Sequence, residues 1–270
     1  MTGFDANKEL LLPFEQKNIP EHYLPYFIAK RTNFIASVQG SRNLWRYYLL
    51  LDEILFTELR DMSTTHDPDR LFPLALLCNA HAKIRVSGEL AFAKCMEEAR
   101  SILRDAIETA VYAHYMHDDP KLQRIWLSND DSPQATIDFK EAFEKDKKNR
   151  SFEGLPILYA RWGYLCEIGS HSTPQAIVSR FKIAESEKDI KYLLNYTGVE
   201  DRDWEPETFM LLQITSMIEE VIFSDYRARL QFDENLLRHR SLAKDLGDQV
   251  RREIIEKHNI PPPTTKSASR

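Results

Sequence analysis

The sequence predicts an all-α protein, a compact bundle of about seven to eight helices with little or no sheet. Glycine and proline, the residues that interrupt helices, lie mainly at the ends of long runs. Segment 74–119 contains Gly88 as its only glycine or proline, and segment 207–260 contains only Gly247. The chain has no Asn-Gly or Asp-Gly pair, the pairs that favour tight β-hairpins. We therefore expect long helices and no strong strand pairing.

The first three predicted helices run from Leu44 to Arg60, from Phe72 to Val86 and from Glu89 to His117. The third is the clearest, because its small and apolar residues recur at the three-and-four spacing of one helical face. These residues, together with one histidine, are Cys95, Met96, Ala99, Ile102, Leu103, Ala106, Ile107, Ala110 and His114. That face must pack against another element.

Two Ser/Thr-Pro pairs mark further helix starts. Ser132 followed by Pro133 has the pattern of an N-cap with proline in the first turn, and opens a fourth helix. Thr173 with Pro174 caps a shorter helix in the same way. The remaining long helices are expected over 155–169, 206–229 and 232–258.

The segment from Glu185 to Trp204 has a weaker pattern. Its apolar residues Ile190, Leu193 and Leu194 fit a short helix, which Thr197 and Gly198 would end.

One globular domain is expected over residues 1–258. The full chain of 270 residues is long enough to bury a substantial core, and its 43% hydrophobic and 29% charged residues are typical of a folded protein. Three consecutive prolines, 261–263, end all helix, and the polar residues 264–270 cannot bury enough apolar surface to offset their ordering entropy. We expect 259–270 to be a disordered tail.

Charge argues against a nucleic-acid partner. The net charge is −6, so no overall attraction for phosphate backbones or anionic lipid exists. A nucleic-acid role would need a local basic patch. The basic residues within 140–150 are interleaved with acidic ones, which is typical of a solvated helix. We expect a protein partner or self-association instead, and no membrane contact.

The cysteines indicate a reducing compartment. Cys78, Cys95 and Cys166 are odd in number and lack the paired spacing of zinc or redox motifs. No stretch approaches the roughly 20 apolar residues of a membrane span. The prediction is a cytoplasmic protein.

The candidate site residues begin with Arg100 and His114, which fall about 60° and about 20° from the centre of the apolar stripe over 89–117. Both should be partly buried, and Arg100 should need a carboxylate partner from another helix. The structural interpretation of Arg100 is a buried ion pair, and its functional interpretation is an anion-binding site. Arg104 and Glu108 lie four residues apart, where they can form a surface pair.

A second cluster contains Tyr164, Glu167, Ser170 and His171. With Leu158, Trp162, Leu165 and Gly169 as the buried stripe, Glu167 points to solvent. A histidine at this helix end also acts as a plain C-terminal cap. His114 and His117 could share a metal by spacing alone, but we predict no metal and no cofactor, because the signal is only two ligands.

The candidate residues also resemble the pattern of known protein families. Arg100, Arg104 and Glu108, with Tyr112, Asp119-Pro120, Tyr159, Tyr164 and Ser170-His171, resemble an uncharacterised family of all-helical prokaryotic proteins, a domain of unknown function, over roughly residues 88–180. The resemblance implies that the Arg-rich helix packs against the helix ending in Ser-His. A looser relation is to the HEPN superfamily of helical ribonucleases and nucleotide-binding proteins. The Arg-to-His spacings at Arg60–His66 and near His258 are no more frequent than chance allows.

Two functions follow. The first is a non-enzymatic protein-interaction or scaffold module, because no catalytic constellation is stronger than its structural explanation and long amphipathic helices supply association surfaces. The alternative is a HEPN-like ribonuclease or nucleotide-binding protein. In that case Arg104, Glu108 and His171 would be catalytic, and Arg100 and Tyr164 would bind the ligand in a pocket between two helices. Enzymatic activity stays open between them.

Overall fold

The computed structural model describes residues 18–62, 71–117, 119–128, 132–144, 152, 154–170, 181–185, 190–194, 201–227 and 234–260. Its α-helices are α3 (Leu24–Gly40), α4 (Arg42–Met62), α5 (Leu71–Phe92), α6 (Met96–His117), α7 (Pro120–Leu127), α8 (Pro133–Phe139), α10 (Pro156–Leu165), α12 (Asp201–Tyr226) and α13 (Glu234–His258). Two π-helical turns, η2 (Lys140–Glu144) and η3 (Cys166–Ser170), follow α8 and α10. The predicted all-α class is confirmed, with nine α-helices in the described residues, slightly more than expected.

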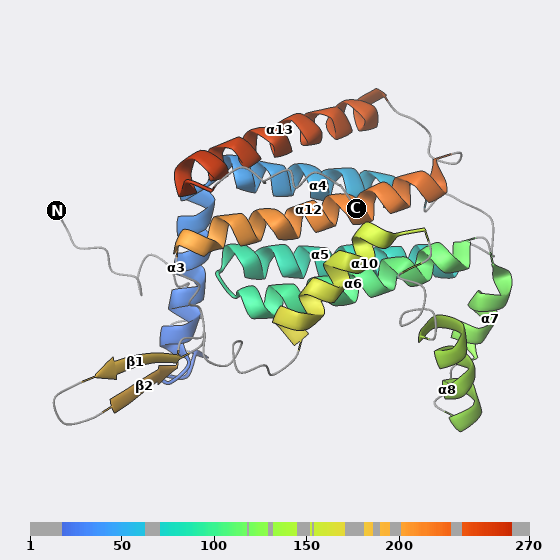
Figure 1. Cartoon of the computed structure of the whole chain (residues 1–270), viewed down its shortest axis with the longest axis horizontal. Coiled ribbons are helices and arrows are strands. Elements are labelled where there is room, and N and C mark those ends of the chain that lie inside the picture. Colours follow the sequence, from blue (N-terminus) through green and yellow to red (C-terminus); the bar gives the residue numbers. More distant parts are fainter. Residues whose placement is uncertain are drawn as a thin grey trace, which may run out of the picture.

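The long helices lie in layers (Figure 1). α5 and α6 form a tightly packed pair, α4 and α12 contact this pair, and α13 packs on α4 and α12. α10 packs against α6, α3 crosses one end of the bundle, and α7 and α8 lie at the opposite end. In the described part of the chain, we find no helix with the length and apolar character needed to cross a membrane.

One part of the core is an aromatic cluster around the ring of Phe92, which is fully buried. The rings of Phe34, Trp45, Tyr48 and Trp204 surround it, with centroids 4.9–6.5 Å away. These side chains come from α3, α4, α5 and α12. Edge-on and tilted ring contacts of this kind contribute beyond simple area burial. The cluster therefore joins segments that are far apart in sequence.

The boundary between α5 and α6 differs from the sequence prediction. The helix expected to start at Glu89 starts at Met96, and the helix expected to end near Val86 continues to Phe92. The chain reverses at Lys94, whose φ of 61° is left-handed. The Cys95 amide donates to the Leu90 carbonyl at 2.8 Å and closes the turn. No glycine marks this turn, so local sequence gave no signal for it.

Gly88 does not end a helix but lies inside α5, where its missing side chain admits a neighbouring ring. A Cβ atom there would lie 2.4 Å from Cε2 of Tyr48, which is itself buried in the core. Gly247, inside α13, also faces a ring, but a Cβ there would lie 3.1 Å from Cζ of Tyr47. The two glycines thus face similar neighbours with different clearance.

This difference in clearance predicts different effects of the same substitution at the two glycines. Gly88→Ala is expected to lower the free energy of unfolding by about 2 kcal/mol, because overpacking a rigid core ring outweighs the helix propensity that alanine gains. Gly247→Ala, the matched control, should change it by less than about 1 kcal/mol in either direction. Urea unfolding of both variants measures the effect. Equal losses at the two sites would contradict the packing argument.

Two other segments also depart from the prediction. The helix expected from Pro206 begins at Asp201, and Pro206 lies inside α12. The Trp204 indole donates to the Ala91 carbonyl at 2.7 Å, so a tertiary contact anchors this first turn.

The predicted short helix around Ile190 is instead β2 (Ile190–Leu194). It pairs antiparallel with β1 (Phe181–Glu185), with Ile183 opposite Tyr192. A five-residue segment that is mostly apolar fits either structure.

The other predicted elements either match or lie outside the described residues. α4, α10 with η3, and α13 agree with the expected helices to within a few residues. Ser132 caps α8 as expected, because its Oγ accepts from the Ala135 amide at 3.2 Å. α3 and α7 were not predicted. The helix at Thr173, residue His171 and residues 261–270 of the predicted tail lie outside the described residues.

Candidate functional site

Arg100 lies in α6 with 8% of its surface exposed. One guanidinium nitrogen donates to Glu97 at 2.8 Å, and another donates to Glu207 of α12. Glu207 is therefore the carboxylate partner that Arg100 was expected to find on another helix. Burial raises the pKa of Glu207, and the Arg100 charge opposes that rise. In this arrangement the Arg100 charge is already compensated by carboxylates.

Arg104 and Glu108 lie one turn apart on α6, with Arg104 Nε 4.0 Å from Glu108 Oε1. Arg104 also contacts Asp105 at 2.8 Å. The Trp162 indole of α10 donates to Glu108 Oε1 at 2.8 Å. The predicted packing of the Arg-rich helix against the helix over 155–169 is thus present, with Glu108 at the contact.

Tyr164 lies on α10 with 39% of its surface exposed, and Glu167 is exposed as its helical phase predicts. η3, which ends one residue before His171, contacts α6. His171 itself lies outside the described residues. The structure therefore brings Arg104 and Glu108 together and leaves the third predicted catalytic residue unplaced.

The histidines of α6 have aromatic or carboxylate neighbours. His114 Nδ1 lies 2.7 Å from Asp225 Oδ2, and the His117 ring packs edge-on against the Tyr226 ring at 4.5 Å. The described residues contain no group of three or more potential ligands that could hold a metal ion.

His81 of α5 is buried, and its ring pairs with Asp52 of α4 at 2.7 Å. Arg85 donates to both oxygens of the same carboxylate, at 2.7 and 3.0 Å. Burial acts to raise the pKa of Asp52, but the hydrogen bonds from His81 and Arg85 outweigh it and hold that pKa at about 2. A carboxylate whose two oxygens are both occupied is well suited to join α4 to α5.

The least expected polar group is Glu58 of α4, which is fully buried. Its carboxyl lies within hydrogen-bonding reach of Glu219 of α12, and no other partner in the described residues reaches its oxygens. Burial, and next the adjacent carboxylate, raise the pKa of Glu58 far above its usual range. We infer that the pair holds one proton between its two carboxyl groups at neutral pH.

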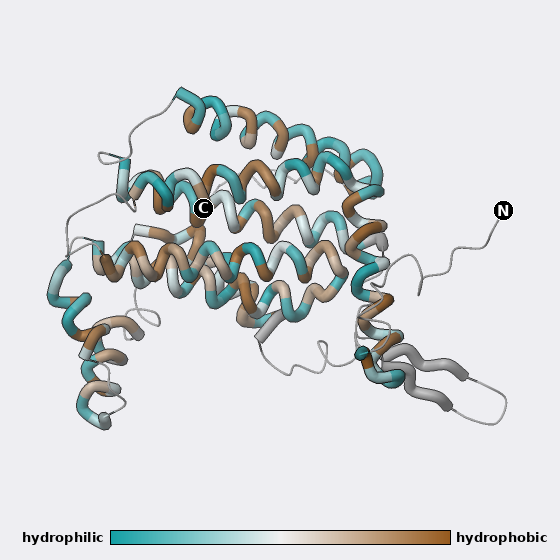
Figure 2. The backbone as a smooth tube through the Cα atoms, turned by 180° about the vertical axis from the view of Figure 1, so that it is seen from behind, coloured by the Kyte–Doolittle hydropathy of each residue, from teal (hydrophilic) through white to brown (hydrophobic). Residues whose placement is uncertain are grey.

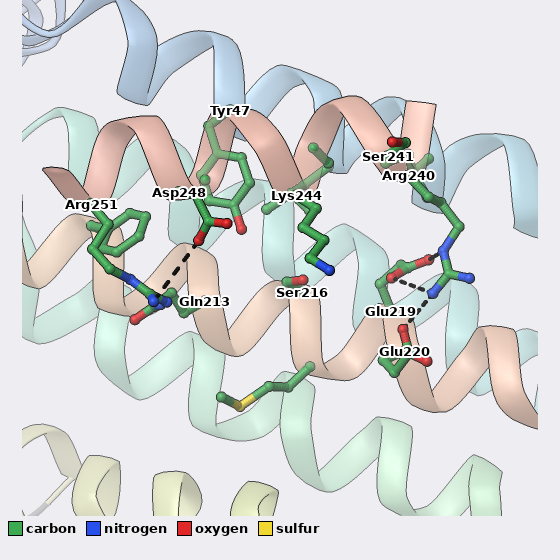
Figure 3. A pocket seen from close by; sticks show the side chains of 16 residues that line it. Tyr47, Gln213, Ser216, Glu219, Glu220, Arg240, Ser241, Lys244, Asp248 and Arg251 are labelled. Carbon is green, nitrogen blue, oxygen red and sulfur yellow. Dashed lines mark hydrogen bonds and ion pairs between the residues drawn. The ribbon is translucent and has the colours of Figure 1, made fainter. Parts of the chain in front are cut away.

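Arg240 of α13 balances the remaining charge of this pair. Its Nε lies 2.7 Å from Glu219 Oε1, and another nitrogen donates to Glu220. Figure 3 shows the guanidinium between these two carboxylates. The guanidinium carbon also lies 3.3 Å from the centre of the Phe223 ring. Glu58, Glu219 and Arg240, here called the buried triad, thus join α4, α12 and α13.

Helical spacing in the sequence contains a signal for Glu58. Leu51, Ile54 and Leu55 are buried on α4, and Glu58 follows them at the same three-and-four spacing. A carboxylate on an apolar stripe is a group that needs a partner. The partner could not be identified from sequence, since Glu219 is 161 residues away.

A groove of about 760 Å³ separates the outer faces of α4 and α13. The two helices run antiparallel, because Asn43 donates to Glu253 at 2.8 Å near one end and Glu53 lies 3.8 Å from His239 near the other. α13 buries only the narrow stripe Leu236, Ala243, Gly247, Val250 and Ile254. Figure 2 shows short hydrophobic patches among the hydrophilic residues along this helix.

Apolar side chains line this α4–α13 groove. Leu49 of α4 and Leu242 of α13 are 45% and 48% exposed, and Leu50 and Leu246 are half-buried beside them. Large exposed apolar side chains that share one concave surface are typical of an association site.

Comparison with known proteins finds no family model that matches this chain, no matching curated protein and no matching solved structure.

Proposed function

We propose that this protein is a non-enzymatic helical interaction module that associates with a second copy of itself through the α4–α13 groove. The observation that carries the proposal is the groove itself, in which four leucines lie between charges of opposite sign. The alternative, a HEPN-like nuclease, depends on His171 and stays a prediction.

The apolar part of the groove supplies the attraction. Leu49 and Leu242 each leave almost half of their surface in water. Burying such side chains stabilises an association by about 25 cal/mol per Å² of apolar area. The groove is open and lies between two helices, which is the shape that receives a helix from a partner.

The charges on α4 favour a second copy as that partner. Arg46 lies two turns before Glu53, both are exposed, and Leu49 and Leu50 lie midway between them. A two-fold axis through the midpoint would place each Arg46 beside Glu53 of the other copy. The α13 rim carries charges of both signs, so the order of charges on α4 decides the docking direction.

The test is the oligomeric state of the full chain, measured by sedimentation equilibrium between about 1 and 200 µM. We expect a dimer, and we expect Leu49→Asp to raise its dissociation constant at least about 30-fold, because the new charge would be buried at the centre of the interface. Leu237→Asp is the matched control. Leu237 is equally exposed on α13, at 48%, but does not line the groove.

A charge exchange tests the direction of docking. Arg46→Glu should weaken the dimer, and adding Glu53→Arg to the same chain should restore it, because the order of charges is then reversed in both copies. A wild-type monomer at 200 µM, or a dimer unaffected by Leu49→Asp, would overturn the proposal.

A further inference from the structure

On the other side of α13, a cleft of about 490 Å³ opens between this helix and α12 (Figure 3). Its volume lies in the range of small-molecule sites. Leu51, Ile54 and Phe209 form an apolar floor, and all three are at most 7% exposed. Gly247 contributes no side chain, so the helix backbone lies close to the ring of Tyr47.

Polar groups converge in the middle of this cleft. Tyr47 is buried beneath α13, and its hydroxyl lies within hydrogen-bonding reach of Ser216 of α12. Gln213 lies one turn before Ser216 on the same wall. In Figure 3 the ammonium of Lys244 extends from α13 towards Ser216. Each of these groups can donate a hydrogen bond within the cleft.

Among the three basic residues that line the cleft, Lys244 is the one whose charge is not paired with a carboxylate of the cleft. Arg240 contacts Glu219 and Glu220, and Arg251 lies 3.9 Å from Asp248. No dashed line in Figure 3 joins Lys244 to any of the three carboxylates that line the cleft. The lining has three basic and three acidic residues and is neutral as a whole, so the position of each charge decides what binds.

We propose that this cleft binds a small molecule in which one oxyanion, a carboxylate or a phosphate, is attached to an apolar body. The oxyanion would lie against Lys244 with Ser216 and Gln213 as further donors, and the apolar body against Phe209. The cleft shares only Asp248 with the lining of the α4–α13 groove, so the proposal does not depend on self-association through that groove.

Four probes with one phenyl ring test the charge requirement. Benzoate and phenyl phosphate carry the two oxyanions, benzyl alcohol carries no charge and benzylamine carries a positive one. Backbone amide shifts of the full chain report binding. We expect benzoate or phenyl phosphate to bind with a dissociation constant below about 10 mM, and the tighter of the two identifies the oxyanion.

Two variants and a control locate the site. Lys244→Gln should weaken the oxyanion probe at least about tenfold, because a charged hydrogen bond is lost. Ser216→Leu should abolish binding by filling the cleft without changing its charge. Arg238→Gln, on an exposed position of α13 outside the cleft, should leave binding unchanged. No oxyanion binding at 10 mM, tighter binding of benzylamine, or equal binding to Lys244→Gln would overturn the proposal.

Discussion

Replacing Arg240 with methionine is expected to lower the free energy of unfolding by about 3 kcal/mol, the largest loss expected for a single change in this protein. The Glu219 side chain is 6% exposed and lies beside two other carboxyl groups. Without Arg240, Glu219 has no counter-charge. Either the Glu58–Glu219 pair keeps its negative charge at a high cost, or it binds a second proton. Urea unfolding at pH 7 measures the loss.

The control for this prediction is Arg238→Met, which removes an exposed arginine two residues earlier on the same helix. It should change stability by less than about 0.5 kcal/mol. Adding Glu219→Gln to Arg240→Met should recover much of the loss, because the unpaired charge is then removed. An Arg240→Met loss no larger than that of the control would mean that the buried triad does not support the fold.

Replacing Glu58 with glutamine is expected to stabilise the protein, and by more at higher pH. Between the usual pKa of 4.5 and the raised pKa in the folded state, the folded chain holds a proton that the unfolded chain has lost. Stability conferred by this proton is complete below pH 4.5 and falls as the pH rises. One proton corresponds to about 1.4 kcal/mol per pH unit.

Glutamine at position 58 keeps the shape of the side chain and can donate a hydrogen bond to Glu219, but its amide does not titrate in this pH range. The stability difference between Glu58→Gln and wild type should therefore widen from pH 5 to pH 8. Glu256→Gln, at an exposed position of α13 outside both the groove and the cleft, should show no such slope. Parallel pH profiles for wild type and Glu58→Gln would show that the pair does not hold a shared proton.

Much of the helical content could be predicted because its signals are local. The Ser132 cap, the stripe from Cys95 to His114 and the low glycine content of 207–260 each depend on residues within a few turns. The spacing on α6 also predicted that Arg100 would be buried and would need a carboxylate. What it could not predict was that Glu207, over one hundred residues away, supplies it.

The misplaced boundaries have tertiary causes. The turn at Lys94 has no glycine and is stabilised where α5 packs on α6, and the first turn of α12 is anchored by the bond from Trp204 to the Ala91 carbonyl. In the sequence, Gly88 indicates a helix end. In the structure it lies inside α5, where the ring of Tyr48 leaves no room for a side chain. In each case a contact between distant segments outweighs a local preference.

The sequence by itself determined the fold class, most of the helices and the faces they bury, because periodicity and caps act over a few residues. Only the tertiary structure decided which charges meet. The buried triad joins α4, α12 and α13. The α4–α13 groove and the cleft between α12 and α13 that contains Lys244 exist only because α13 packs on both other helices. The physical reason is that a side chain's charge and burial depend on neighbours brought together by packing, which spacing along one helix does not encode.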